Sequence, residues 1–327
     1  MATGKKNNQQ KMRFLTLNIA CAFGMCTHAY AQFPDKPIEV VVPYPPGAST
    51  DFIARSLQVP MAEGLGQSIV IENRGGAGGN IGASYVARSP GNGYRLLLST
   101  NATVTINPHV YKKTGFDTLK DFKPVALLAS GPLCLTVNGK LGVNTLAELI
   151  AKAKASDLSF GSAGNGSPQH VAGELLNEAA GISMTHIPYR GIGPALTDLL
   201  GGSLPVMFST CSAIMPHLNG TAIKLIAVTT QGRFSGLPQT PTIAETFPKF
   251  DASAWFALYA PKGTPDDVIA KLNTTVNAAL ATPSVRTALQ DNALTPVGGK
   301  PEVLQQITQN DLQRWGPVVK AKAILQD

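Results

Sequence analysis

The stretch IEVVVPYPPGASTDFIARSLQVPMAEGL, residues 38–65, holds the arrangement on which the fold class depends. It opens with a mainly apolar, β-branched run that predicts a strand over residues 38–42. A loop rich in proline, glycine and serine follows over residues 43–49. Apolar side chains at helical spacing then predict a helix over residues 50–65, which Pro60 is expected to kink or end early. A strand, a polar loop and a helix in this order are typical of an α/β sheet.

The same arrangement recurs along the chain. Further strands are predicted over residues 69–71, 95–98, 158–160 and 206–208, and each is followed by glycine, serine, asparagine or threonine. Loops that open helices present unpaired backbone N–H groups and the positive end of the helix dipole, which suit an anion. Because open α/β sheets bind ligands beyond the carboxyl ends of their strands, the five loops are expected to converge on one cleft. Taken singly, each polar residue is better explained as a cap of its own helix.

The rest of the chain is expected to be mainly helical. Helices are predicted over residues 265–281, 284–290 and 302–325, with a break or bend in the last of them at Gly316 and Pro317. They form a helical flank that packs against the core.

Composition excludes several classes of protein. The 327 residues are 44% hydrophobic and 14% charged, which suits a globular protein of about two domains and excludes a disordered or coiled-coil chain. Of the net charge of +7, four positive charges come from Lys5, Lys6, Lys11 and Arg13. The remaining basic residues are scattered and are not interleaved with aromatic residues, so a nucleic-acid partner is not expected.

The N-terminus has the pattern of a secretory signal. A basic run is followed by a short apolar stretch over residues 14–25 and by Ala29-Tyr30-Ala31, which predicts a cleaved signal peptide over residues 1–31. The apolar stretch is too short to span a membrane, so the mature protein is expected to be soluble and exported. A lipoprotein cysteine at Cys21 is the weaker alternative, because the preceding residues lack the usual leucine.

Export bears on the cysteines. Only Cys134 and Cys211 remain after residue 31, and they enter an oxidising compartment where a disulfide is possible. Two separately buried cysteines are the preferred interpretation, with a disulfide left open.

Motifs for catalysis and cofactors do not match. Residues 76–82 are rich in glycine but lack GxGxxG spacing and an acidic residue about 20 positions further on. Phosphate-binding and hydrolase motifs are missing from the sequence. His109, His170, His186 and His217 are dispersed and lack the spacing of metal ligands. We therefore expect no catalytic residue, no cofactor and no metal.

Several motifs carry a family resemblance along nearly the whole chain after residue 32. They are residues 33–44 (FPDKPIEVVVPY), 47–51 (GASTD) with Ala54-Arg55, 72–82 (ENRGGAGGNIG), 121–124 (DFKP), 160–170 (FGSAGNGSPQH) with 172–175 (AGEL), 186–191 (HIPYRG) with 194–200 (PALTDLL), and Arg314-Trp315 with 318–320 (VVK). Together and in this order they resemble the Bug receptors, the periplasmic solute-binding proteins of tripartite tricarboxylate transporters.

The resemblance implies an α/β, two-lobed type II periplasmic binding protein fold with a ligand cleft between the lobes. Lobe 1 would comprise residues 32–132 together with 258–327, and lobe 2 residues 133–257. The implied function is a non-enzymatic periplasmic receptor. It would capture a small organic carboxylate, either a di- or tricarboxylate or an aromatic one, and deliver it to membrane permease subunits. The sequence gives no basis for an oligomer, so a monomer is expected. Two alternatives remain, a ligand-binding subunit of a carboxylate-sensing system and a secreted enzyme acting on carboxylates.

The resemblance also implies two gripping loops. In the first, Ser49 and Thr50 would donate to the carboxylate, while Asp51 would cap the helix that it opens. Ala48 stands where the family often has a second glycine, which narrows the backbone freedom of this loop.

In the second loop the candidates are Ser162, Gly164, Asn165, Ser167 and, at lower weight, His170. Six residues are expected at the lips of the cleft, where they could set specificity: Tyr44, Phe52, Ser99, Tyr189, Thr210 and Arg190. For each of them, a role in core packing or an exposed surface position is an equally good or better explanation. Tyr44 and Phe52 together favour a ligand with an aromatic ring.

Overall fold

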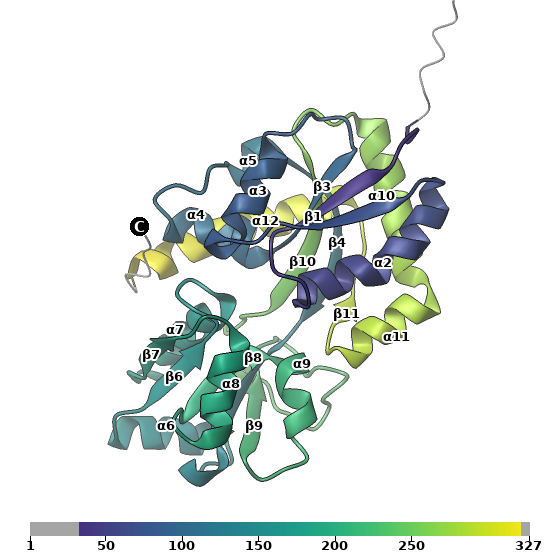
Figure 1. Cartoon of the computed structure of the whole chain (residues 1–327). Coiled ribbons are helices and arrows are strands. Elements are labelled where there is room, and N and C mark those ends of the chain that lie inside the picture. The colour runs from purple at the N-terminus through teal and green to yellow at the C-terminus, as the bar shows by residue number, and fades with distance from the viewer. Residues whose placement is uncertain (1–32, 322–327) are drawn as a thin grey trace, which may run out of the picture. The chain divides into compact units, whose positions relative to one another are not determined.

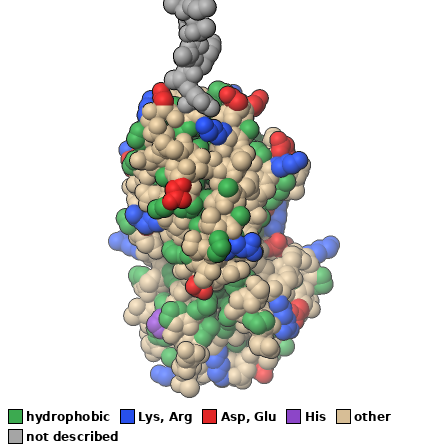
Figure 2. All heavy atoms as spheres, turned by 90° about the vertical axis from the view of Figure 1, so that its right-hand side faces the viewer, with side chains coloured by type: hydrophobic (Ala, Val, Ile, Leu, Met, Phe, Trp, Pro, Cys, Tyr) green, Lys and Arg blue, Asp and Glu red, His purple; other side chains and the backbone are tan. Residues whose placement is uncertain are grey.

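The computed structural model describes residues 33–321, so the predicted signal peptide lies outside the described residues. Residues from Lys36 onward form one compact unit. Within the described residues, no helix combines the length and the apolar character needed to cross a membrane. On the face that Figure 2 shows, acidic and basic side chains are interspersed over the surface.

A six-stranded sheet forms the first half of this unit, in the order β11-β4-β10-β3-β1-β2 (Figure 1). Its strands are β1 (Ile38–Val42), β2 (Ile69–Asn73), β3 (Arg95–Thr100), β4 (Phe122–Gly131), β10 (Ala254–Pro261) and β11 (Thr295–Pro296). Strand β1 pairs in parallel with β2 and β3, whereas β10 is antiparallel to β3 and β4. The carboxyl ends of β1, β2 and β3 therefore meet at one edge of the sheet.

Helices cover this sheet. They are α2 (Ser49–Leu65), α3 (Asn80–Ala87), α4 (Asn107–Val110), α5 (Thr118–Asp121), α10 (Asp266–Ala281), α11 (Pro283–Asp291) and α12 (Pro301–Ala321), with single turns at Ala77–Gly79 and Ala102–Ile106. Helices α2, α10 and α11 pack on one another, and α12 packs against β4 (Figure 1). The C-terminal helical flank is thus part of the first sheet's half of the molecule.

A five-stranded sheet forms the second half, in the order β7-β6-β8-β5-β9. Its strands are β5 (Leu133–Asn138), β6 (Ser159–Ser162), β7 (Thr185–Pro188), β8 (Val206–Thr210) and β9 (Ile223–Val228). Its helices are α6 (Leu146–Ala155), α7 (Pro168–Ala180), α8 (Ile192–Gly201) and α9 (Cys211–Ile214), with single turns at Gly139–Leu141, Met215–His217 and Ile243–Glu245. Strands β6, β7 and β8 run parallel, so their carboxyl ends share an edge as well.

The chain crosses from the first sheet to the second between β4 and β5, which are separated by one residue, and returns through β10. Strand β10 begins at Ala254 and pairs with β4 from its first residue. The predicted second crossing near residue 257 therefore falls inside a strand of the first sheet.

Neither of the two helices predicted to be interrupted by proline ends at its proline. Helix α2 continues through Pro60 to Leu65 and ends at Gly66, which adopts the left-handed conformation that suits a helix C-terminus. Helix α12 likewise continues through Pro317. In both cases α2 and α12 pack buried apolar residues such as Leu57 and Trp315 against the protein, which offsets the hydrogen bond that each proline removes.

The preference for two separate cysteines is also wrong. Cys134 and Cys211 form a disulfide with their Cα atoms 5.1 Å apart. The antiparallel pairing of β5 with β8 explains their proximity, because it places Leu133 opposite Thr210, the residue that precedes Cys211. The bridge joins a central strand of the second sheet to the start of α9.

Candidate ligand-binding site

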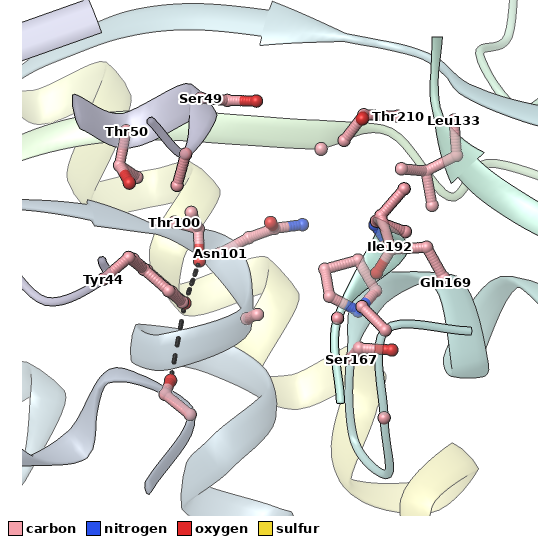
Figure 3. Close-up of a pocket in the computed structure, with 18 of the residues that line it drawn as sticks. Tyr44, Ser49, Thr50, Thr100, Asn101, Leu133, Ser167, Gln169, Ile192 and Thr210 are labelled. Atoms are coloured by element: carbon pink, nitrogen blue, oxygen red, sulfur yellow. Dashed lines mark hydrogen bonds between the residues drawn. The ribbon is translucent and has the colours of Figure 1, made fainter. Parts of the chain in front are cut away.

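A cavity of about 810 Å³ lies where the two sheets' loops meet. Figure 3 shows Ser49, Thr50 and Asn101 on one side of it and Ser167 and Thr210 on the other. Ser49 and Thr50 open the helix that follows β1, and Asn101 directly follows β3. Ser167 lies in the loop after β6, and Thr210 is the last residue of β8. Gly78, which follows β2, also lines the cavity, so the predicted convergence is confirmed for all five strand ends.

The start of α2 forms one wall of the cavity. The helical ladder begins with the Phe52 N–H, which donates to the Ala48 carbonyl at 2.9 Å. The amides of residues 49–51 therefore have no acceptor within the helix. Ala48 is the residue that precedes the helix, and it supplies no side-chain cap. Helix α2 is 17 residues long, and the backbone N–H groups at its N-terminus consequently face the cavity.

Asp51 holds the first loop from behind. Its carboxylate accepts hydrogen bonds from the Gly47 amide at 3.0 Å, from Asn73 Nδ2 at 3.0 Å and from Arg55 Nε at 2.9 Å. Burial raises the pKa of Asp51, but the bonds from Arg55, Gly47 and Asn73 outweigh it and hold that pKa below its usual value. The predicted capping role differs in detail, because Asp51 accepts from an amide before the helix rather than from the free amides of α2.

The start of α7 forms the facing wall. Ser167 precedes the helix, and its Oγ accepts the His170 N–H at 3.2 Å. Pro168 has no N–H, which leaves the Gln169 amide as a helical N–H without an acceptor in the helix. Gly164 and Gly166 adopt φ angles of 127° and 70°, which favour glycine. Their amides are used inside the loop, since Gly164 N donates to Ser162 Oγ and Gly166 N to His170 Nδ1.

A third helix N-terminus adjoins the cavity. Helix α8 follows Gly191, which has a φ of 110° and no side-chain cap, and both Gly191 and Ile192 line the cavity. The sequence analysis did not single out these two residues. A signal was present, because a glycine directly before a helical run is a helix start with exposed amides.

The electrostatics of the cavity come from neutral groups. None of the residues that line it in the described part of the chain is Asp, Glu, Lys, Arg or His. Positive potential is supplied instead by the starts of α2, α7 and α8 and by backbone N–H groups. The arrangement can therefore stabilise an anion without a cationic side chain.

Tyr44 forms part of the polar floor. Its hydroxyl is within hydrogen-bond distance of Thr103 Oγ1 at 2.6 Å and of Thr100 Oγ1 at 3.0 Å, and Figure 3 marks the latter bond. Burial raises the pKa of Tyr44. Because its hydroxyl is already hydrogen-bonded, Tyr44 contributes its aromatic ring to the cavity rather than a free hydrogen-bond donor.

Three buried polar atoms belong to residues that line the cavity. Thr50 Oγ1, Asn101 Oδ1 and Gln169 Oε1 have no hydrogen-bond partner. Asn101 is oriented by its Nδ2, which donates to the Ser253 carbonyl at 3.1 Å. Unpaired buried polar groups are costly, so both sides of the cavity have unused hydrogen-bonding capacity.

The structure brings together eight of the predicted ligand-binding residues around the cavity. They are Tyr44, Ala48, Ser49, Thr50, Gly164, Asn165, Ser167 and Thr210. Lining residues that the sequence analysis missed include Asn101, Asn107, Tyr111, Gln169, Ile192 and Phe256. Gln169 lies inside a quoted motif and Asn101 lies three residues after the strand predicted over residues 95–98, so position was their only signal.

The other six predicted residues do not line this cavity, and these placements depart from the prediction. Ser99 is fully buried in β3, whose side chains alternate, so Thr100 rather than Ser99 faces the cavity. Phe52 lies on another face of α2, in a neighbouring cavity of about 460 Å³. The pairing of Tyr44 and Phe52 therefore does not support an aromatic ligand.

The remaining three polar candidates and Arg190 are engaged or placed elsewhere. Tyr189 donates its hydroxyl to Asp198 Oδ2 at 2.8 Å. Ser162 and His170 form part of the support behind the second loop. Arg190 is exposed at the surface.

The geometry agrees with comparisons to known proteins. Residues 53–324 match the family model described as the tripartite tricarboxylate transporter family receptor, TctC. The chain belongs to this receptor family. The predicted Bug-type resemblance is thereby confirmed.

Several similar proteins align with this chain over most of their length. Protein BugT of Bordetella pertussis is 37% identical over 292 residues, which cover 88% of this chain and 90% of BugT. The solved structure of R. palustris Rpa4515 with adipate is 37% identical, with a TM-score of 0.80 over 88% of this chain and 97% of that one. MatC of Rhodopseudomonas palustris, with bound malate, is 34% identical, with a TM-score of 0.77 over 88% of this chain and 100% of that one. The two-lobed periplasmic binding protein fold is therefore confirmed.

Proposed function

We propose that this receptor captures a small organic carboxylate in the 810 Å³ cavity and delivers it to the membrane permease subunits of a tripartite tricarboxylate transporter. It acts as an exported, monomeric protein in the periplasm and performs no chemistry on the ligand. The single observation that carries the proposal is the meeting of the α2 and α7 N-termini at a cavity without charged side chains. Such a site favours an anion through backbone amides and helix dipoles.

The two halves divide the binding between them. We assign residues 36–132 and those from 254 onward to lobe 1, and residues 133–253 to lobe 2, following the strand order of the two sheets. Each lobe supplies one helix N-terminus of the pair, so a carboxylate makes its full set of hydrogen bonds only when both are near it. The ligand accordingly favours the closed arrangement by its differential contacts.

Adipate and malate are the first ligands to test, since similar receptors hold them in their structures. Both carry two carboxylates on short aliphatic chains. In this chain a second carboxylate would be met by neutral groups such as those at Gly191 and Ile192 at the start of α8, because no arginine or lysine of residues 33–321 lines the cavity. An aromatic monocarboxylate and citrate belong in the same panel as competitors.

The experiment distinguishes the contribution of the Ser49 backbone N–H to ligand affinity from that of the Ser49 hydroxyl. Ser49→Ala removes the hydroxyl and keeps the amide. Ser49→Pro also removes the amide, and proline fits the first position of a helix whose preceding residue is extended, as Ala48 is with φ −71° and ψ 161°. Asp266→Pro, at the start of α10 outside the cavity, is the control for a proline at a helix start.

Affinity for adipate, malate, citrate and benzoate is measured by calorimetry on protein first freed of bound solute by unfolding and refolding. We expect one carboxylate to bind, Ser49→Pro to weaken it by about tenfold or more, and Ser49→Ala to weaken it less. Equal affinity of Ser49→Pro and the unaltered protein would remove the α2 amides from the site. Lack of binding by every carboxylate would contradict the proposed ligand class.

A further inference from the structure

The second gripping loop, residues 162–167, rests on two histidines that do not line the cavity. The Gly166 N–H donates to His170 Nδ1 at 3.1 Å. His186 Nε2 lies 2.6 Å from Ser162 Oγ, which also receives the Gly164 N–H at 3.0 Å. Both ends of the loop are therefore bonded to an imidazole.

The two imidazoles form a stack. The ring centroids of His170 and His186 are 3.6 Å apart with an angle of 9° between the planes. The Phe160 ring lies beside them, at 5.1 Å from His186 and 6.4 Å from His170. His170 comes from α7, His186 from β7 and Phe160 from β6, so the stack ties a helix to two strands behind the loop.

The hydrogen bond from Gly166 fixes the protonation of His170. An N–H donor needs a lone pair on Nδ1, so His170 is neutral and carries its proton on Nε2. Burial and the nearby His186 lower the pKa of His170 to about 3, and burial lowers that of His186 to about 4. Both rings are accordingly uncharged at neutral pH, as a close stack of two imidazoles requires.

The loop needs such support because of its composition. Gly164 and Gly166 both have left-handed φ angles, and glycine loses more backbone freedom on ordering than other residues. If the loop is already ordered before the ligand binds, the loss of backbone conformational entropy does not reduce the binding affinity. The stack is bonded to a glycine-rich loop, and its own residues do not line the cavity.

We propose that His170 and His186 are positioning residues that fix residues 162–167 in the shape that faces the ligand. The inference rests on the proposed function, since it assumes that this loop contacts the bound carboxylate. It predicts that the Nδ1 acceptor of His170 matters more than the bulk of its side chain.

Two variants distinguish the role of the His170 Nδ1 acceptor from the role of the size of the His170 side chain. His170→Leu keeps an apolar side chain and removes the acceptor, whereas His170→Asn offers an oxygen near the position of Nδ1. His217→Leu alters an exposed histidine outside the loop and is the control. Amide hydrogen exchange at Gly166 reports the loop itself, and calorimetry with adipate reports its consequence for binding.

We expect His170→Leu to exchange at Gly166 about tenfold faster and to bind adipate about fivefold more weakly, as for the loss of one hydrogen bond. His170→Asn should restore most of the exchange protection at Gly166 and most of the affinity for adipate. His217→Leu should change neither of these two quantities. Unchanged exchange and affinity in a folded His170→Leu would overturn the proposal.

Two further measurements keep the outcomes distinct. Nitrogen-15 spectra of the unaltered protein should place the His170 proton on Nε2, and a proton on Nδ1 would overturn the proposal even if His170→Leu does not fold. If the unaltered protein does not bind adipate, that result counts against adipate as the ligand, while Gly166 exchange still decides the role of His170.

Discussion

The disulfide between Cys134 and Cys211 should account for a large share of the stability of this receptor. It closes a loop across a sequence separation of 77 residues. In the chain-entropy treatment of cross-links, a loop of that length contributes about 4.5 kcal/mol by restricting the unfolded chain. We therefore expect reduction to lower the free energy of unfolding by about 2–4 kcal/mol.

The assay is urea denaturation of the chain from Gln32 onward, which contains only these two cysteines. Trp255 and Trp315 are 6% and 2% exposed, so their fluorescence reports unfolding. The unaltered protein is compared with and without a phosphine reductant. A Cys134→Ala, Cys211→Ala double variant serves as control, because the reductant should not change its stability.

Two results would refute this reasoning. One is a difference below about 1 kcal/mol between the oxidised and reduced protein, well under the loop-closure value. The other is the titration of two free thiols in denatured protein that was never reduced.

The remaining predictions concern packing and acid stability. A methyl group added at Gly173 in α7 would overlap the Phe160 ring, so Gly173→Ala should lose about 1–3 kcal/mol, whereas Gly201→Ala, with open space in α8, should be neutral or gain about 0.5 kcal/mol; equal melting temperatures of the two variants would contradict this. The pKa values of His170 and His186 are lowered in the folded state from 6.5 to about 3 and about 4. The unfolded chain therefore binds more protons below pH 6.5, and stability falls as the pH drops from there toward the folded-state values. Allowing for the partial exposure of His186, we expect protonation of this pair to lower the free energy of unfolding by about 3 kcal/mol between pH 7 and pH 5, as measured by urea titration. The His170→Asn, His186→Asn double variant should show a correspondingly smaller change in stability over this pH range.

The sequence predicted the fold class and much of the site. Alternation of apolar runs, small polar loops and helical spacing depends on local physics, so the strands ending at Val42, Thr100, Ser162 and Thr210 were expected to within a few residues. The motif of residues 160–170 likewise placed Gly164, Asn165 and Ser167 at the cavity. The helices do not end at Pro60 or Pro317, because tertiary packing of α2 and α12 overrides a local helix-ending preference.

Local sequence patterns specify which segments lie at the strand ends, and the motifs specify the receptor family. Which side chains face the cavity depends on how the strands and helices pack in three dimensions. A shift of one residue in a strand moves a side chain to the opposite face, which is why Thr100 lines the cavity and Ser99 does not. The pairing of Cys134 with Cys211 and the stacking of His170 on His186 also join residues distant in the chain, and these contacts depend on strand register and helix packing that no local pattern specifies.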